Sequence, residues 1–163
     1  MALSADPLPP TPVAASVPPD IGVASLYQEI ILSHYRSPKH KGALANAGAP
    51  VEHRNPLCGD VLSVQVVMDG DRIADAAFCA RACSITQATA SMLLSRVIGG
   101  TAADARTVMA SIERLIESAA PLSESDALDL GDLRALTSVS RFPARKACVR
   151  LVTGAFSEAL SAT

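Results

Sequence analysis

The sequence predicts an α+β domain in which helices cover one face of a small antiparallel sheet. Three observations indicate this class. A helical segment comes first, two strand-like segments flank an Asp69-Gly70 turn, and every later segment is helical. Asp-Gly between two such segments favours a tight hairpin, so the strands pair antiparallel. The apolar fraction of 49% includes three Phe, two Tyr and no Trp, and we therefore expect an aliphatic core.

The first predicted helix spans residues 26–37, with Ser25 as its N-cap and Pro38 beyond its end. Its expected buried face carries residues at helical spacing, namely Leu26, Ile30, Ile31 and His34. A loop rich in Gly, Ala and Pro follows. The two strands are then predicted over residues 61–68 and 72–78.

Helical spacing returns after Cys83, with a helix over residues 84–98 that ends at a Gly-Gly pair. The next helix begins at Thr101, which forms a capping box with Asp104. Its expected buried stripe is Val108, Ile112, Leu115 and Ile116. Beyond it we expect an acidic, partly irregular loop over 121–131, a short helix over 133–139 and a last helix that starts at Pro143.

One change in composition, at about residue 23, divides the chain. Residues 1–22 are rich in Pro and Ala and hold no Lys or Arg, so we expect a disordered tail, followed by one domain over residues 23–163. The tail lacks the basic start and the unbroken apolar segment of a secretory signal. We therefore expect a cytoplasmic protein whose four cysteines serve as metal ligands or reactive thiols more often than as disulfides.

Charge and hydropathy exclude two classes of partner. A formal net charge of -2 and a pI near 5.9 lack the basic character that nucleic-acid binding needs. No segment is apolar over the length needed to span a bilayer. The one basic run, formed by Arg36, Lys39, His40 and Lys41, is interpreted as a solvated face near a turn, with a docking patch as the alternative.

Cys58 and Asp60 stand two positions apart, and in an extended segment such side chains project to the same side. They can therefore reach one ion. Gly59 between them adds backbone freedom for a thiolate and a carboxylate to approach a common centre. Taken alone, a Cys-Gly-Asp sequence is more often a plain turn.

Two further cysteines have positions that suit a metal centre. Cys83 stands just before a predicted helix, whose free amide groups and dipole favour a thiolate. Cys148 lies on the apolar side of the last helix, with Arg145 and Lys146 as cationic neighbours that also favour a thiolate. Taken alone, Cys83 is equally well explained as a buried, inert cysteine, and for Cys148 that is the commoner explanation. Together with Cys58 and Asp60 they would complete a tetrahedral Cys3Asp site suited to zinc or iron.

Cys79 complicates this assignment, because it stands four residues before Cys83 at the expected end of a strand. We interpret it as a partly buried thiol, with a fifth sulfur at the centre as the alternative. The three histidines, His34, His40 and His53, show no ligand-like spacing.

Three ordered motifs resemble the U-type iron–sulfur scaffold family. They are Asn-Pro-Leu-Cys-Gly-Asp over 55–60, Cys-Ser-Ile-Thr-Gln-Ala-Thr-Ala-Ser-Met over 83–92 and Phe-Pro-Ala-Arg-Lys-Ala-Cys over 142–148. The segment from Tyr27 to Lys39 also looks like the opening helix of that family. The long segment between Cys83 and Cys148, with its Leu-Gly-Asp-Leu sequence, resembles the SufU branch. The IscU branch has a His before the last Cys, where this chain has Ala147.

The SufU resemblance implies a zinc-containing sulfur acceptor. Such a protein takes persulfide sulfur from a SufS-like, pyridoxal-phosphate-dependent cysteine desulfurase and passes it to downstream iron–sulfur assembly proteins. The resemblance implies that Cys58 is the acceptor, released when a desulfurase histidine replaces it on the metal, and that Arg145 supports docking. It also implies a set of zinc ligands, namely Cys58, Asp60, Cys83 and Cys148.

The sequence is also compatible with two other functions. One is a scaffold that assembles a transient iron–sulfur cluster on the same four residues. The other is a non-catalytic binding module in which zinc only stabilises the fold. Ala80 and Ala82 stand where the family usually has glycines, which predicts a stiffer or differently shaped loop before Cys83.

Overall fold

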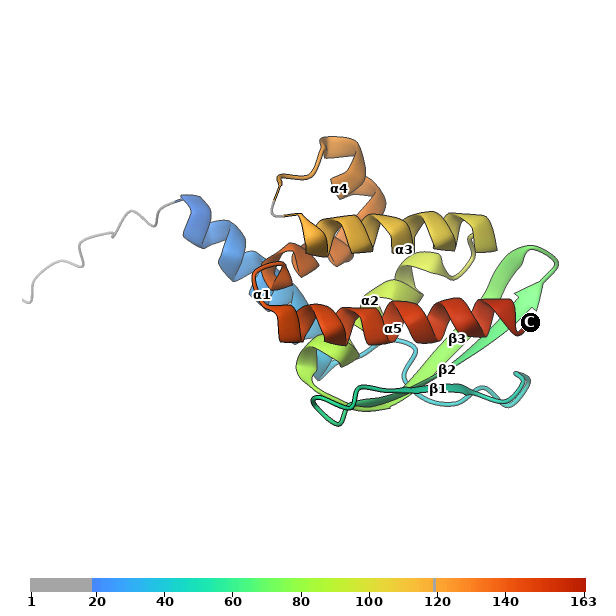
Figure 1. The fold of residues 1–163 in the computed structure, drawn as a ribbon. Helices are drawn as coiled ribbons and strands as arrows, with labels where there is room; N and C mark the ends of the chain where they lie inside the picture. Colours follow the sequence, from blue (N-terminus) through green and yellow to red (C-terminus); the bar gives the residue numbers. More distant parts are fainter. Residues whose placement is uncertain (1–18, 119) are drawn as a thin grey trace, which may run out of the picture.

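The computed structural model describes residues 19–118 and 120–163, and a three-stranded antiparallel sheet lies at the base of this part of the chain (Figure 1). Helix α5 crosses β1 and β2, and α2 packs against β3. Helix α3 lies further from the sheet and contacts α2 and α5. The predicted α+β class, with an antiparallel sheet and helices on one face, is confirmed.

The sheet is built around the predicted hairpin. Strand β2 spans Val61–Asp69 and β3 spans Arg72–Arg81, with antiparallel pairing and a bulge after Val67. A third strand, β1 over Val51–Arg54, pairs with the other edge of β2 and was not predicted. It is only four residues long and alternates half-buried with exposed charged positions, so its sequence carries little strand signal.

Helix α1 begins earlier than predicted, because it spans Pro19–Arg36. Proline is tolerated in the first turn of a helix, where its missing N–H has no partner in any case. Ser25 therefore lies inside the helix and is not its N-cap, and Leu26 is 52% exposed rather than buried. Ile31 and His34 are buried as expected. Of the predicted tail, residues 1–18 lie outside the described residues.

Helices α2 and α3 follow the predicted pattern. Helix α2 spans Ser84–Val97 and α3 spans Ala102–Glu117. The capping box is present, since the amide of Asp104 donates to Thr101 Oγ1 at 3.0 Å and the amide of Thr101 donates to Asp104 Oδ2 at 3.1 Å. These hydrogen bonds lower the pKa of Asp104. The predicted stripe of α3 is buried throughout.

The predicted irregular loop over 121–131 contains a short helix, α4, over Glu124–Leu130. Ser123 caps it by accepting from the amide of Asp126, and Gly131 ends it at a φ of 53°. Leu128 is 81% exposed, so α4 has no apolar stripe by which the sequence could reveal it. A 3-10 helix, η1, then spans Gly131–Val139, and α5 spans Pro143–Ser161, both close to their predicted positions.

The core between the sheet and the helices is aliphatic, as predicted, with Phe78 and Phe156 as its fully buried aromatic residues. None of the described helices is long and apolar enough to cross a membrane.

His34 joins three helices through a buried polar contact. Its Nδ1 lies 2.8 Å from Ser91 Oγ on α2, and its Nε2 lies 2.9 Å from Asp132 Oδ2 on η1. Ser91 is fully buried and its Oγ also accepts from the amide of Lys39. This Ser-His-Asp arrangement is therefore a structural link and not a nucleophilic site, because no substrate can reach the hydroxyl.

The capping box supplies a test of the fold. We expect Thr101→Ala to lower the free energy of unfolding by about 1 kcal/mol, because it removes the side chain that caps α3. Thr107→Ala on the exposed face of the same helix is the matched control, and it should change stability far less. Urea unfolding followed by circular dichroism measures both, and equal effects of the two substitutions would contradict the capping role.

Candidate metal centre

The turn between β1 and β2 carries two of the predicted site residues, Cys58 and Asp60. The amide of Asn55 donates to the Asp60 carbonyl at 2.9 Å, and the amide of Gly59 donates to the Asn55 carbonyl at 2.8 Å. Gly59 adopts a φ of +73°, which favours glycine. The expected extended segment is thus a tight turn, and this turn brings the thiol and the carboxylate toward the same point.

Asp60 is buried, and each of its carboxylate oxygens accepts a hydrogen bond from the start of α2. Thr86 Oγ1 donates to Oδ2 at 2.7 Å, and the amide of Cys83 donates to Oδ1 at 3.1 Å. Because Thr86 is fully buried, this contact fixes the carboxylate relative to the helix. The β1–β2 turn and α2 are therefore locked together through one side chain.

Cys83 is the N-cap of α2, where the sequence placed it. Its Sγ accepts from the amide of Thr86 at 3.5 Å, so the thiol occupies the position of a capping oxygen. The Sγ also lies 3.6 Å from Cys148 Sγ.

Cys148 projects inward from an early turn of α5 and is buried, as predicted. Its Sγ donates to the Ala144 carbonyl one turn earlier at 3.4 Å. Burial raises the pKa of Cys148 to about 12, and the hydrogen bond and charge of Cys83 act in the same direction.

The expectation that Arg145 and Lys146 favour a thiolate at Cys148 is therefore wrong. The guanidinium of Arg145 lies over the ring of Phe142, 4.7 Å from its centroid, and Lys146 Nζ lies 3.7 Å from Glu117 Oε2. Both cations are directed toward other partners. With no cationic side chain to hold it charged, a thiolate at Cys148 needs a positive charge from elsewhere.

Three of the four predicted residues form one cluster of candidate ligands, and the fourth, Cys83, lies next to it. Ligand atoms of Cys58, Asp60 and Cys148 lie within 4.8 Å of one another, and Cys83 adjoins them through its contacts with Asp60 and Cys148. Thiols and a carboxylate are donors that suit a tetrahedral zinc ion, and Cys83 is the nearest candidate for a fourth ligand. Their exposure differs, because Cys58 and Cys83 are exposed whereas Asp60 and Cys148 are buried.

A groove beside the thiols opens to solvent between α1, the start of α2 and the start of α5. Its apolar wall includes Ile31, Leu32 and Ile85, and Phe142 and Arg145 lie at its edge. Leu57, next to Cys58, is 88% exposed. A partner that reaches Cys58 therefore meets an apolar surface with one guanidinium at its edge.

Cys79 lies apart from this group. It is exposed on the face of β3 opposite to Phe78, and its Sγ donates to the Gly42 carbonyl at 3.2 Å. The expectation of a partly buried thiol is wrong, because alternation along the strand turns residue 79 outward. Among the described residues, the only cluster of three or more candidate ligands is the one that holds Cys58, Asp60 and Cys148.

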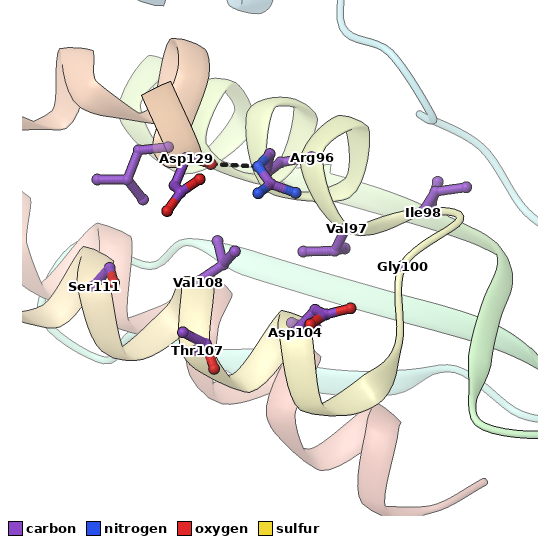
Figure 2. A pocket seen from close by; sticks show the side chains of 11 residues that line it. Arg96, Val97, Ile98, Gly100, Asp104, Thr107, Val108, Ser111 and Asp129 are labelled. Atoms are coloured by element: carbon purple, nitrogen blue, oxygen red, sulfur yellow. Dashed lines mark hydrogen bonds between the residues drawn. The ribbon is translucent and has the colours of Figure 1, made fainter. Parts of the chain in front are cut away.

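Another cleft lies at the opposite end of α2, next to α3 and the end of α4. Figure 2 shows Arg96 extending toward Asp129, whose carbonyl accepts from Arg96 Nε. The lining of this cleft contains no thiol or histidine. The Arg96–Asp129 hydrogen bond joins α2 to α4. The cleft therefore lacks the ligands that a zinc site of the thiol kind would need.

Two residues at the centre were missed by sequence reasoning, namely Thr86 and Gln87. Thr86 holds Asp60, and Gln87 Nε2 donates to the carbonyl of Ala82 at 2.8 Å. The only local signal for Thr86 is its place three residues after an N-capping cysteine. The contact of Gln87 depends on the shape of the loop before Cys83 and has no local signal.

Comparison with known proteins identifies the class to which this fold and site belong. Residues 26–149 match the family model of the NifU-like N-terminal domain, which covers most of the chain and includes all four candidate ligands. The chain belongs to this family.

Individual relatives come from two branches of iron–sulfur assembly proteins. The zinc-dependent sulfurtransferase SufU of Bacillus subtilis is 37% identical over 127 residues, which are 78% of this chain and 84% of the relative. The iron–sulfur cluster assembly scaffold protein IscU of Streptococcus pyogenes is 33% identical over 135 residues, covering 83% and 82% of the two chains.

Solved structures show the same fold. One is described as a scaffold protein of the SUF system from Fervidobacterium islandicum, with a TM-score of 0.74 and 27% identity, covering 83% of this chain and 97% of that one. Another is a NifU-like N-terminal protein from Brucella abortus, with a TM-score of 0.74, 25% identity and coverages of 85% and 94%. The SufU resemblance inferred from the three motifs is confirmed.

The burial of Cys148 supplies a test of the site in the metal-free protein. Because the thiolate is the reactive form, we expect iodoacetamide to label Cys58 rapidly and Cys148 slowest of the four cysteines at pH 8. Between pH 7 and 10 the rate at Cys148 should rise about tenfold per pH unit, since this range lies below its pKa of about 12.

Peptide mass spectrometry of a labelling time course measures these rates. The control is the same reaction in guanidinium chloride, where unfolding should bring the four rates close together. Equal rates at Cys58 and Cys148 in the folded protein would contradict the burial of the second thiol.

Proposed function

We propose that this protein is a zinc-dependent sulfur acceptor of iron–sulfur cluster assembly. The observation that carries the proposal is the different way in which the clustered thiols are held. Asp60 and Cys148 are buried, and Cys83, although exposed, caps α2, whereas Cys58 lies on an exposed turn. Cys58 can thus meet a partner while the other donors keep their places.

The proposed zinc ligands are Cys58, Asp60, Cys83 and Cys148. The donor set suits zinc, since Cys58, Asp60 and Cys148 form one cluster and Cys83 Sγ lies 3.6 Å from Cys148 Sγ, where we propose it as the fourth ligand. When bound, zinc supplies the positive charge that keeps the thiols deprotonated, which the side chains around Cys148 do not supply. The chain orients the donors itself, by capping α2 with Cys83 and by hydrogen-bonding Asp60 to that helix.

Cys58 is the residue that receives sulfur. Its thiolate attacks the outer sulfur of a cysteine persulfide on the partner, which breaks the sulfur–sulfur bond there and forms one on Cys58. The partner's cysteine leaves as a thiolate, so the step needs no oxidant or reductant. Cys58 lies on the exposed turn before Gly59, while Asp60 is held to α2 by two hydrogen bonds.

The proposed donor is a cysteine desulfurase that carries its own pyridoxal phosphate, and the proposed recipients are downstream iron–sulfur assembly proteins of the cytoplasm. Support comes from the matching relative in Bacillus subtilis, which is named a zinc-dependent sulfurtransferase. Arg145 would assist docking, because its guanidinium stands over Phe142 at the edge of the groove beside Cys58.

A second candidate, a scaffold that builds a transient iron–sulfur cluster, is favoured by one observation. Two relatives that match over most of this chain are named iron–sulfur cluster assembly scaffold protein IscU. Both functions would use the same four residues. Metal content separates them, because the sulfur acceptor holds stable zinc whereas a scaffold gains an oxygen-labile brown chromophore with iron and sulfide.

Replacement of Cys58 tests the proposed function. We expect the wild-type protein to hold one zinc ion per chain and to stimulate a cognate desulfurase. Cys58→Ser should remove the stimulation while the protein stays folded, because serine cannot accept the sulfur. Elemental analysis, circular dichroism and sulfide release by the desulfurase measure the three properties.

Cys79→Ser is the matched control, since it removes an exposed thiol outside the centre and should keep both zinc and stimulation. Full stimulation by folded Cys58→Ser would overturn the assignment of the acceptor. A lower unfolding temperature as the only effect would instead identify a zinc that merely stabilises the fold.

A further inference from the structure

The peptide group between Ala82 and Cys83 is held from both sides. Its N–H, from Cys83, donates to Asp60 Oδ1 at 3.1 Å. Its carbonyl, from Ala82, accepts from Gln87 Nε2 at 2.8 Å. A carboxylate on one side and a side-chain amide on the other therefore determine how this peptide plane is turned, and Cys83 follows directly from it.

Gln87 is itself held by a charged group. Lys41 Nζ donates to Gln87 Oε1 at 2.7 Å, which leaves the amide nitrogen of Gln87 to face the Ala82 carbonyl. Gln87 is buried, so its side chain cannot exchange these partners for bulk water. A hydrogen bond from a lysine is stronger than one between neutral groups, and it polarises the amide that it contacts.

The backbone places Lys41 where it can make this contact. The amide of Phe78 donates to the His40 carbonyl at 2.9 Å, and the amide of Gly42 donates to the Phe78 carbonyl at 2.8 Å. Lys41 is thereby aligned with β3, as an isolated bridge with Phe78. Lys41, which belongs to the basic run of the sequence, therefore has Gln87 as a hydrogen-bond partner and is not simply a solvated charge.

We propose that Gln87, oriented by Lys41, is a positioning residue for Cys83 and Asp60 at the metal centre. The hydrogen bond from Gln87 fixes the Ala82 carbonyl, and so directs the N–H of the same peptide at the Asp60 carboxylate. Groups that orient metal ligands without touching the metal typically change metal affinity 10- to 100-fold when removed. This inference rests on the proposed zinc centre and goes beyond it, because neither residue is a ligand.

Gln87→Met tests the proposal, because methionine fills a similar volume and cannot donate to Ala82. We expect a zinc dissociation constant about 10-fold larger than that of the wild type, measured by competition with a chromophoric chelator. In the metal-free protein, we expect about 10-fold faster hydrogen exchange at the amide of Cys83, measured by NMR.

Gln65→Met is the matched control. Gln65 also holds loop backbone through its amide, with Oε1 accepting from Leu44 at 3.0 Å and Nε2 donating to the Gly48 carbonyl at 2.9 Å. That loop lies away from Cys83 in the chain and contacts none of the four proposed ligands through these bonds. Gln65→Met should leave zinc affinity and Cys83 exchange unchanged.

Lys41 supplies a second test that leaves the core untouched, because Lys41 is exposed. Lys41→Met should raise the zinc dissociation constant about threefold, and Lys41→Arg should restore it by keeping a cationic donor. Lys39→Met is the control for loss of charge alone, and it should have no effect.

Unchanged zinc affinity and Cys83 exchange in Gln87→Met would overturn the positioning role, as would equal effects of Gln65→Met. Hydrogen exchange separates this inference from the proposed function. If the wild type bound no zinc but Gln87→Met still exposed the Cys83 amide, the proposed function would fail while the positioning role would stand.

Discussion

The rest of the site depends on the buried carboxylate of Asp60. It accepts from the amide of Cys83 and from the hydroxyl of Thr86, so it ties the β1–β2 turn to the start of α2. A buried carboxylate is costly unless its oxygens have partners, and these two donors come from one helix end. Because Cys58 shares the turn with Asp60, the same contact also sets where the exposed thiol can lie.

Helix α5 and the β1–β2 turn give their two thiols different environments. Helix α5 buries Cys148 deep enough to raise its pKa to about 12, whereas the turn leaves Cys58 open to the groove. A buried thiol with a high pKa becomes a good ligand only when a cation displaces its proton. The centre therefore combines buried donors with an exposed thiol, which suits the proposed sulfur transfer between two proteins.

Features with local signals could be predicted from the sequence, such as the hairpin, the capping box at Thr101 and the start of α5 at Pro143. Strand β1 and helix α4 could not, because a short charged strand and a solvent-exposed helix lack an apolar pattern. The spacing of the cysteines does not by itself predict that they lie close together. That prediction came from the resemblance of the three motifs to the SufU family. The contacts of Gln87 could not be predicted, since they join segments that meet only in the folded chain.

The ligands of the proposed zinc ion can be measured by X-ray absorption at the zinc edge, on protein purified without added metal. We expect one zinc per chain with three sulfur ligands and one oxygen ligand, and loss of the oxygen ligand in Asp60→Ala. Cys79→Ser should leave the spectrum unchanged. A zinc bound by four sulfurs, or a centre that holds iron and sulfide in place of zinc, would contradict the proposed zinc site.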